Sequence, residues 1–125
     1  MQKNMKKFLI DANVILRYLL NDIEDMANEA KKVIDSGAWT LPEVIAEVVY
    51  VLKSVYKVDR KEIANAILEI LKEIEIEHKN VMNEALKIFS ETNLDFVDCI
   101  LIAYNKVENI EIFSFDKKLN NKLNQ

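Results

Sequence analysis

The chain has 125 residues, of which 50% are hydrophobic and 30% are charged, as in ordinary globular proteins, so we expect a single domain over residues 1–125. Its lone cysteine, Cys99, excludes an internal disulfide and predicts a cytoplasmic location, and no apolar run is long enough to predict a membrane partner. The net charge of −4 disfavours broad electrostatic binding of nucleic acid.

The first half of the chain alternates short apolar runs with helical patterns. Residues 6–11 and 38–41 are typical of short buried strands, and residues 13–20 and 23–37 have the spacing of helices, the second closed by Gly37. Thr40 and Glu43 form a possible capping box, with Pro42 in the first turn, for a helix over 43–57.

The second half repeats this alternation. Asp59 and Glu62 form a second possible capping box for a helix over 60–72. The strands expected next are 74–78 and 111–115; the helices are 80–91, a nearly all-buried 96–107, and a short one after Asp116. Strands alternating with helices predict a three-layer α/β fold with a small, mainly parallel sheet flanked by helices.

Several acidic residues lie beside apolar segments, and each has a simple structural explanation. Asp11 and Asp116 each follow a predicted strand and suit the N-cap of the next helix. Asp95 suits the N-cap of the buried helix, which places Asp98 in its first turn, where the helix dipole favours negative charge. Glu47 lies in mid-helix, with no terminus to cap, and fits a polar stripe on the solvent side.

The joint arrangement of these acids favours a metal site. Ligands bind beyond the carboxyl ends of the strands in open parallel sheets, and Asp11, Glu47, Asp98 and Asp116 are all expected at that rim. Two like charges about 4 Å apart repel by roughly 4 kcal/mol at an effective dielectric near 20. A divalent cation removes this repulsion, and an all-oxygen ligand set suits Mg²⁺ or Mn²⁺.

These segments resemble the PIN-domain family, and within it the VapC-type toxins of toxin–antitoxin pairs. The resemblance rests on FLIDANVILRYLLND, TLPEVIAEVVYVL, LDFVDCILIAYN and IFSFDKKL, which stand in the family's order and spacing over nearly the whole chain. Ala12 and Ser114 stand where the family often has threonine. Both positions support the site rather than bind metal, so we expect tuning of activity rather than its loss.

The resemblance implies an endoribonuclease dependent on Mg²⁺ or Mn²⁺, the toxin of a VapBC-type pair, which leaves 5′-phosphate and 3′-hydroxyl ends. It implies that Asp11, Glu47, Asp98 and Asp116 are the catalytic metal ligands. Asn13 and Ser114 are then supporting residues, and Asp95 is a frequent acidic companion. The implied partners are an RNA substrate, a cognate antitoxin and a second copy in a homodimer, with segments 23–36 and 60–72 offering apolar faces for protein contacts.

Other conspicuous residues have structural interpretations. We expect His78 at the surface, Cys99 in the core, and Trp39, Tyr50, Tyr104 and Phe113 in the core rather than as base-stacking platforms. A basic cluster of Lys53, Lys57, Arg60 and Lys61 is expected to be a solvated face, whereas Lys117, Lys118 and Lys122 lie closer to the predicted site and favour RNA contact.

Two other functions remain open. One is a receiver-like phosphorylation switch, which requires an acidic pair after the first strand, where this chain has Asp11 alone. The other is a non-catalytic interaction module in which the acids act only as helix caps. The missing acids disfavour the receiver-like switch. Titration with Mn²⁺ distinguishes the interaction module from a metal-dependent enzyme, because caps do not respond to metal.

Overall fold

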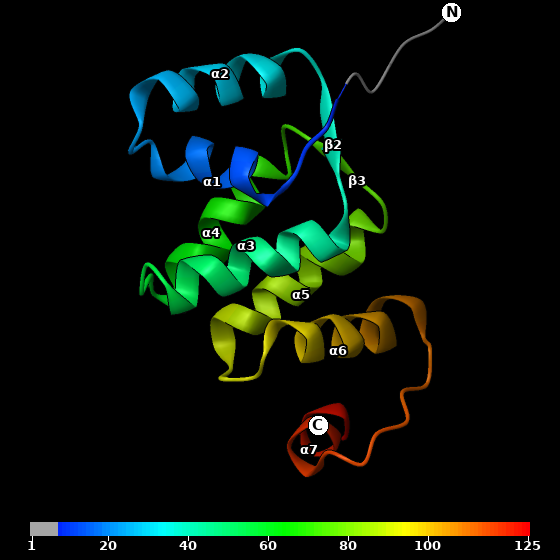
Figure 1. Ribbon diagram of the computed structural model, residues 1–125. Helices are drawn as coiled ribbons and strands as arrows, with labels where there is room; N and C mark the ends of the chain where they lie inside the picture. The colour runs from blue at the N-terminus through cyan, green and yellow to red at the C-terminus, as the bar shows by residue number, and fades with distance from the viewer. Residues whose placement is uncertain (1–7) are drawn as a thin grey trace, which may run out of the picture.

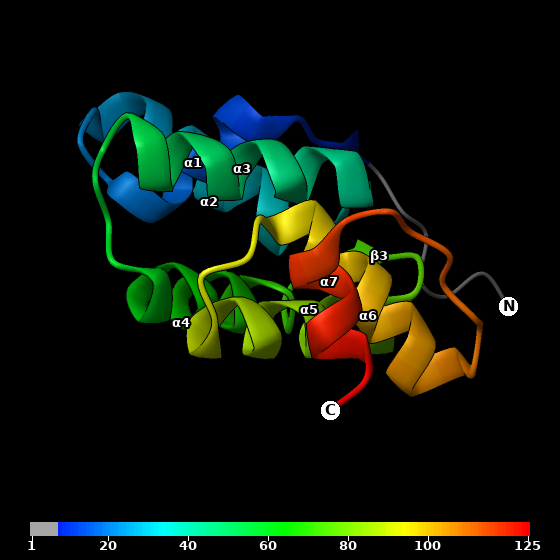
Figure 2. The ribbon, with the colours of Figure 1, turned by 90° about the horizontal axis from the view of Figure 1, so that it is seen from below.

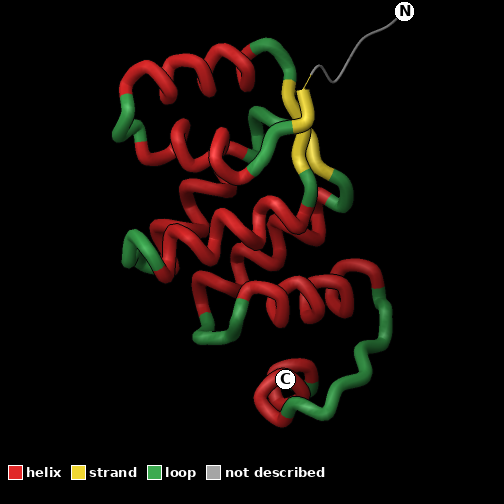
Figure 3. The backbone as a smooth tube through the Cα atoms, in the orientation of Figure 1, coloured by secondary structure: helices red, strands yellow, loops and turns green. Residues whose placement is uncertain are grey.

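The sheet of this protein is small and parallel. A computed structural model describes residues 8–125 and contains strands β1 (Phe8–Leu9), β2 (Ala38–Thr40) and β3 (Glu75–Ile76). They are all parallel and lie in the order β1-β2-β3, with Phe8 opposite Ala38 and Thr40 opposite Ile76. Figure 3 shows the three strands together on one side of the molecule. The predicted α/β class with a small parallel sheet flanked by helices is confirmed.

Helices make up most of the described chain. Their bounds are α1 (Ala12–Leu20), α2 (Glu24–Asp35), α3 (Pro42–Ser54), α4 (Arg60–Ile70), α5 (Lys79–Glu91), α6 (Phe96–Glu108) and α7 (Lys117–Leu123). In Figure 1, α1 and α2 lie at one end of the molecule, α3, α4 and α5 lie in the middle, and α6 and α7 lie at the other end. No helix within residues 8–125 is long and apolar enough to cross a membrane.

One hydrophobic core runs through these layers. It contains fully buried side chains from α1, α3, α4 and α5, including Ile15, Ile45, Ile63 and Phe89. Each comes from the apolar face of an amphipathic helix, because apolar residues three or four positions apart share one side of a helix. The core holds the helix N-termini that present the acidic residues.

Most of the predicted helices are confirmed within a few residues of their ends. Gly37 closes α2 at a φ of 107°, a value that favours glycine, and Pro42 is the first residue of α3. Asp59 is the N-cap of α4, where its side chain accepts a hydrogen bond from the amide of Lys61. Residues 6 and 7 of the first predicted strand lie outside the described residues.

The predicted capping box at Thr40 is wrong. Leu41 is the N-cap of α3 and makes no side-chain capping bond. Thr40 is instead the last residue of β2, completely buried, and its hydroxyl donates a 2.8 Å hydrogen bond to the carbonyl oxygen of Ile10. A threonine before a helix suits either role, and burial against β1 decides in favour of the strand.

The predicted strand over 111–115 is also wrong, because this segment is irregular and pairs with no strand. Its two ends are held by side-chain amides: Asn105 donates to the carbonyl of Ile110 (3.0 Å) and Asn120 to that of Ser114 (2.8 Å). These bonds tie the segment to α6 and α7, and Figure 2 shows α7 lying against α6. Phe113, which was predicted in the core, is therefore 84% exposed.

Helix α6 is less buried than its sequence predicts. Phe96, Cys99, Ile102 and Ala103 face the core, but Val97 is 58% exposed. Tyr50 on α3 was likewise predicted in the core and is 66% exposed. The surface between α3 and the start of α6 is thus partly apolar.

Candidate active site

Asp11 lies just beyond β1, at the start of α1. Its Oδ1 accepts a 3.1 Å hydrogen bond from the amide of Val14, so its predicted role as an N-cap is confirmed. The preceding residue, Ile10, is fixed to β2 on both sides, because its amide donates to the carbonyl of Trp39 (2.9 Å) and its carbonyl accepts from Thr40. The sheet therefore positions Asp11, while the cap occupies one carboxylate oxygen.

Asp116 occupies the same position at the start of α7. Its Oδ1 accepts a 3.0 Å hydrogen bond from the amide of Leu119, which confirms the N-cap prediction here as well. Ser114, predicted as a supporting residue, contacts Asp116 directly: its Oγ accepts a 2.9 Å hydrogen bond from the Asp116 amide. This contact fixes the backbone that carries the carboxylate.

The two acids of α6 differ from these caps. Asp95 is at the N-cap position, yet its side chain makes no capping hydrogen bond. Asp98 lies in the first turn and is partly buried. Burial raises the pKa of Asp98, and the nearby negative charges of Asp116 and Asp95 raise it further, against a smaller opposing effect of Lys118. Three carboxylates from two helix starts thus share one electrostatic environment.

Glu47 and Asn13 lie on the exposed sides of their helices. Glu47 is in the second turn of α3, and within residues 8–125 its carboxylate has no hydrogen-bond or ion-pair partner. Asn13 is exposed in the first turn of α1. Within residues 8–125, neither side chain makes a hydrogen bond or ion pair that would explain its position.

The four predicted metal ligands have the right chemistry for a metal ion, but the structure does not bring them all together. The donors are all carboxylate oxygens, which suit Mg²⁺ or Mn²⁺. Across the described chain, however, no three His, Cys, Asp or Glu side chains are close enough to enclose an ion. The structure brings Asp98 into electrostatic contact with Asp95 and Asp116. Convergence of all of Asp11, Glu47, Asp98 and Asp116 on one ion stays a prediction.

Comparison with known proteins places this arrangement in a family. The PIN-domain model matches residues 8–122, which is nearly the whole chain. The chain belongs to the PIN-domain family. It is also similar to a VapC ribonuclease of Aquifex aeolicus (strain VF5), with 28% identity over 123 residues that cover 88% of this chain and 87% of that protein. The resemblance recognised from the four motifs is thereby confirmed.

One residue that positions this PIN domain's acids was not identified from the sequence. The Arg60 guanidinium donates hydrogen bonds to the carbonyl oxygens of Phe89 (2.9 Å) and Leu94, and it lies 3.7 Å from the centre of the Phe89 ring. Leu94 directly precedes Asp95, so Arg60 anchors the turn that starts α6. Its place in a basic run suggested a solvated residue, and no local pattern distinguishes an arginine that binds distant carbonyls.

Proposed function

We propose that this PIN domain is a divalent-metal-dependent endoribonuclease, the toxin of a VapBC-type toxin–antitoxin pair. The observation that carries the proposal is the group of Asp95, Asp98 and Asp116, in which burial, and after it the charges of Asp116 and Asp95, raise the pKa of Asp98. Such a group disfavours its own ionised state and favours binding of a cation. The family match over residues 8–122 and the VapC relative support the choice of RNA as substrate.

In this proposal, each residue has a defined task. Asp11, Glu47, Asp98 and Asp116 would hold Mg²⁺ or Mn²⁺. When bound, the metal supplies a water of lowered pKa and polarises the scissile phosphate. Ser114 holds the Asp116 backbone, and Asn13 orients a ligand or water. Lys118, whose charge acts on Asp98, attracts the RNA phosphates.

The cap contacts support a second candidate, a non-catalytic interaction module. Capping bonds to Val14 and Leu119 account for Asp11 and Asp116 without any metal. They do not account for Glu47 or Asp98, which make no such bond in the described chain. The ribonuclease proposal therefore accounts for more of the acidic residues than the interaction module does. A receiver-like switch gains no support, because Asp11 remains the only acid directly after β1.

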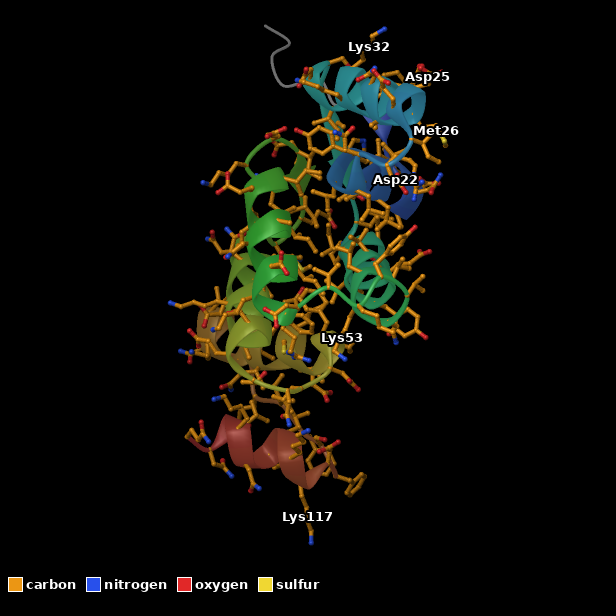
Figure 4. The ribbon with its side chains drawn as sticks, turned by 90° about the vertical axis from the view of Figure 1, so that its left-hand side faces the viewer. Asp22, Asp25, Met26, Lys32, Lys53 and Lys117 are labelled. Atoms are coloured by element: carbon orange, nitrogen blue, oxygen red, sulfur yellow. The ribbon has the colours of Figure 1, made fainter. Side chains whose placement is uncertain are left out.

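We further propose that a cognate antitoxin and a second copy bind this protein. Support comes from a mainly apolar pocket of about 320 Å³ on α1 and α2, formed in part by Val14, Met26 and Val33. Met26 in its wall and Ile23, the N-cap of α2, are 43% and 45% exposed, and Figure 4 shows Met26 at the outer surface of α2. The proposed location is the cytoplasm, where the unpaired Cys99 thiol stays reduced.

The deciding experiment incubates purified protein with total RNA and Mg²⁺ or Mn²⁺, followed by mapping of the cut ends. We expect cleavage with 5′-phosphate ends, and we expect Asp11→Asn and Asp98→Asn to abolish it while both variants stay folded. Mn²⁺ should also raise the melting temperature of the wild type, because it binds only the folded state, and this gain should largely vanish in Asp98→Asn and Glu47→Gln.

Two results would contradict the proposal. Cleavage that persists in EDTA, or that leaves 2′,3′-cyclic phosphates, would mean that the RNA 2′-hydroxyl is the nucleophile and that metal is not required. An identical Mn²⁺ response in wild type, Asp98→Asn and Glu47→Gln would remove these residues from the metal site and would favour the interaction module.

A further inference from the structure

A pocket lies beside the start of α6, next to the acidic group. It has a volume of about 280 Å³, and its walls come from α3, α4, α5 and α6. That volume is near the lower end of the range for ligand-binding pockets, roughly 300–1,000 Å³. It suits one planar group the size of a nucleobase rather than a large ligand.

The side chains of this pocket combine apolar surface with positive charge. Tyr50 of α3 and Val97 of α6 line it and are 66% and 58% exposed, so an aromatic ring and an aliphatic group face solvent together. Lys53 and Arg60 line it as well, against the single carboxylate of Asp95. The pocket is therefore locally positive on a protein whose net charge is −4. This combination suits a base attached to a phosphate.

Arg60 gives the pocket a fixed cation. Its guanidinium is held by the carbonyl oxygens of Phe89 and Leu94 and stacks on the Phe89 ring, so its charge cannot move away from the wall. Lys53 is exposed, and within residues 8–125 its ammonium has no hydrogen-bond or ion-pair partner, so it is free to bind a phosphate. In Figure 4, Lys53 lies in the middle of the molecule, between Lys32 at the end that carries α2 and Lys117 at the end that carries α7.

The pocket continues the face of α3 that carries Glu47. Tyr50 is three residues after Glu47 and Lys53 is three residues after Tyr50, so each side chain neighbours the next on the helix surface. The row winds around α3, and Lys53 lies roughly a third of a turn from Glu47 around the axis. At about 1.5 Å per residue, roughly 9 Å separates Glu47 from Lys53 along the axis. On the opposite wall, Asp95 belongs both to the pocket and to the acidic group around Asp98. The pocket therefore adjoins the acidic group through Asp95.

We propose that this pocket is a subsite for single-stranded RNA, in which Tyr50 stacks on the base beside the cut and Lys53 binds the adjoining phosphate. The subsite rests on the proposed ribonuclease function and adds the path of its substrate. It also assigns a role to the first basic cluster, which the sequence alone placed on a solvated face.

The test measures RNA binding apart from cleavage. The full chain with Asp98→Asn is titrated, without added metal, into a short fluorescein-labelled oligouridylate while anisotropy is recorded. Tyr50→Ala should weaken binding roughly tenfold, because stacking on an aromatic ring is lost. Tyr50→Phe should keep the affinity of its parent. Lys53→Gln should weaken binding and lower the slope of log affinity against log salt by about 0.7, as expected for one lost phosphate contact.

Matched controls separate this role from folding and from general charge. Lys87→Gln removes an equally exposed lysine from α5, outside the pocket, and should leave both affinity and salt slope unchanged. Thermal unfolding of every variant should match that of its parent, since Tyr50 and Lys53 are exposed. In the cleavage-competent wild type with Mn²⁺, Tyr50→Ala should raise KM more than it lowers kcat.

The outcomes distinguish the subsite from the proposed function. Unchanged binding by Tyr50→Ala and Lys53→Gln would overturn the subsite, even where the wild type cleaves RNA with Mn²⁺. Normal RNA binding with loss of self-association or of antitoxin binding would make the pocket a protein interface and would also overturn it. If the protein neither binds nor cleaves RNA, the proposed ribonuclease function is refuted, and the subsite with it.

Discussion

The hydroxyl of Thr40 donates a 2.8 Å hydrogen bond to the carbonyl oxygen of Ile10, the residue immediately before Asp11. Thr40 is completely buried and is the last residue of β2. This contact joins two strands at the point where the first of them passes into α1. The direction in which Asp11 leaves the sheet thus depends on a side chain that lies thirty positions after Ile10 in the sequence.

Replacement of Thr40 by valine should destabilise the protein by roughly 1–3 kcal/mol, because the substitution removes a buried donor from the Ile10 carbonyl while preserving side-chain volume. Urea unfolding gives the free energy. Thr40→Ser keeps the hydroxyl and is the matched control, with a smaller loss expected. A loss of stability in Thr40→Ser with none in Thr40→Val would show that the methyl group, rather than the hydrogen bond, accounts for the stability.

Ionised Asp98 should lower the stability of the metal-free protein. Its pKa is raised in the folded state by burial, then by Asp116 and Asp95, so the folded state binds the proton more tightly than the unfolded state. The stability that the protonated Asp98 carboxyl contributes is therefore lost as pH rises through its folded pKa. At neutral pH the ionised carboxylate opposes folding. Asp98→Asn should melt higher than wild type at neutral pH in EDTA, and this difference should shrink at acidic pH.

Asp25→Asn is the matched control for that measurement. Asp25 lies in the first turn of α2, where its charge suits the helix dipole, so its removal should slightly lower the melting temperature at neutral pH. A lower melting temperature for Asp98→Asn as well would contradict the electrostatic argument.

Asp95→Asn should reduce RNA cleavage far less than Asp98→Asn does. Asp95 makes no capping bond that the substitution could break, and asparagine is itself a good N-cap, so the start of α6 should survive. Neutralising a residue that acts on Asp98 through its charge should lower the cleavage rate roughly 10-fold to 100-fold. Single-turnover rates with Mn²⁺ measure both variants. Complete loss of cleavage in both variants would indicate that Asp95 is itself a metal ligand.

Arg60→Met should destabilise the protein by about 3 kcal/mol, because the variant keeps an unbranched stem over Phe89 but loses charged hydrogen bonds to Phe89 and Leu94. Lys61→Met at the next position is the control. Its ammonium makes only an exposed 3.4 Å bond to the Ser90 carbonyl, so a change within about 0.5 kcal/mol is expected. Similar losses in both variants, measured by urea unfolding, would refute the anchoring role of Arg60.

Features set by neighbours in sequence were predictable. Asp11, Asp59 and Asp116 are N-caps because a side-chain oxygen reaches an amide two or three residues ahead, whatever the rest of the fold does. The helix periods and the closure of α2 at Gly37 are local in the same sense. The raised pKa of Asp98 follows partly from its neighbour Asp95, which the sequence also places beside it.

Features set by distant contacts were not predictable. The alternating pattern of 111–115 is that of a strand, but strand formation needs a partner edge, and Asn105 and Asn120 hold this segment elsewhere. Tyr50 has the apolar character of a core residue, yet it is 66% exposed, because distant packing decides which face of α3 is covered. Whether Asp11 and Glu47 meet Asp98 depends on the same long-range placement of helices, and therefore stays a prediction.

The burial of Cys99 gives this chain a built-in reporter of unfolding. Its side chain is completely buried and close to Thr92, and burial raises the pKa of the thiol to about 11. At neutral pH the folded protein therefore holds almost no thiolate for an alkylating reagent to attack. Because the chain has no other cysteine, the rate at which a thiol reagent alkylates the purified protein would report the exposure of Cys99, by opening of α6 or by global unfolding, without any introduced label.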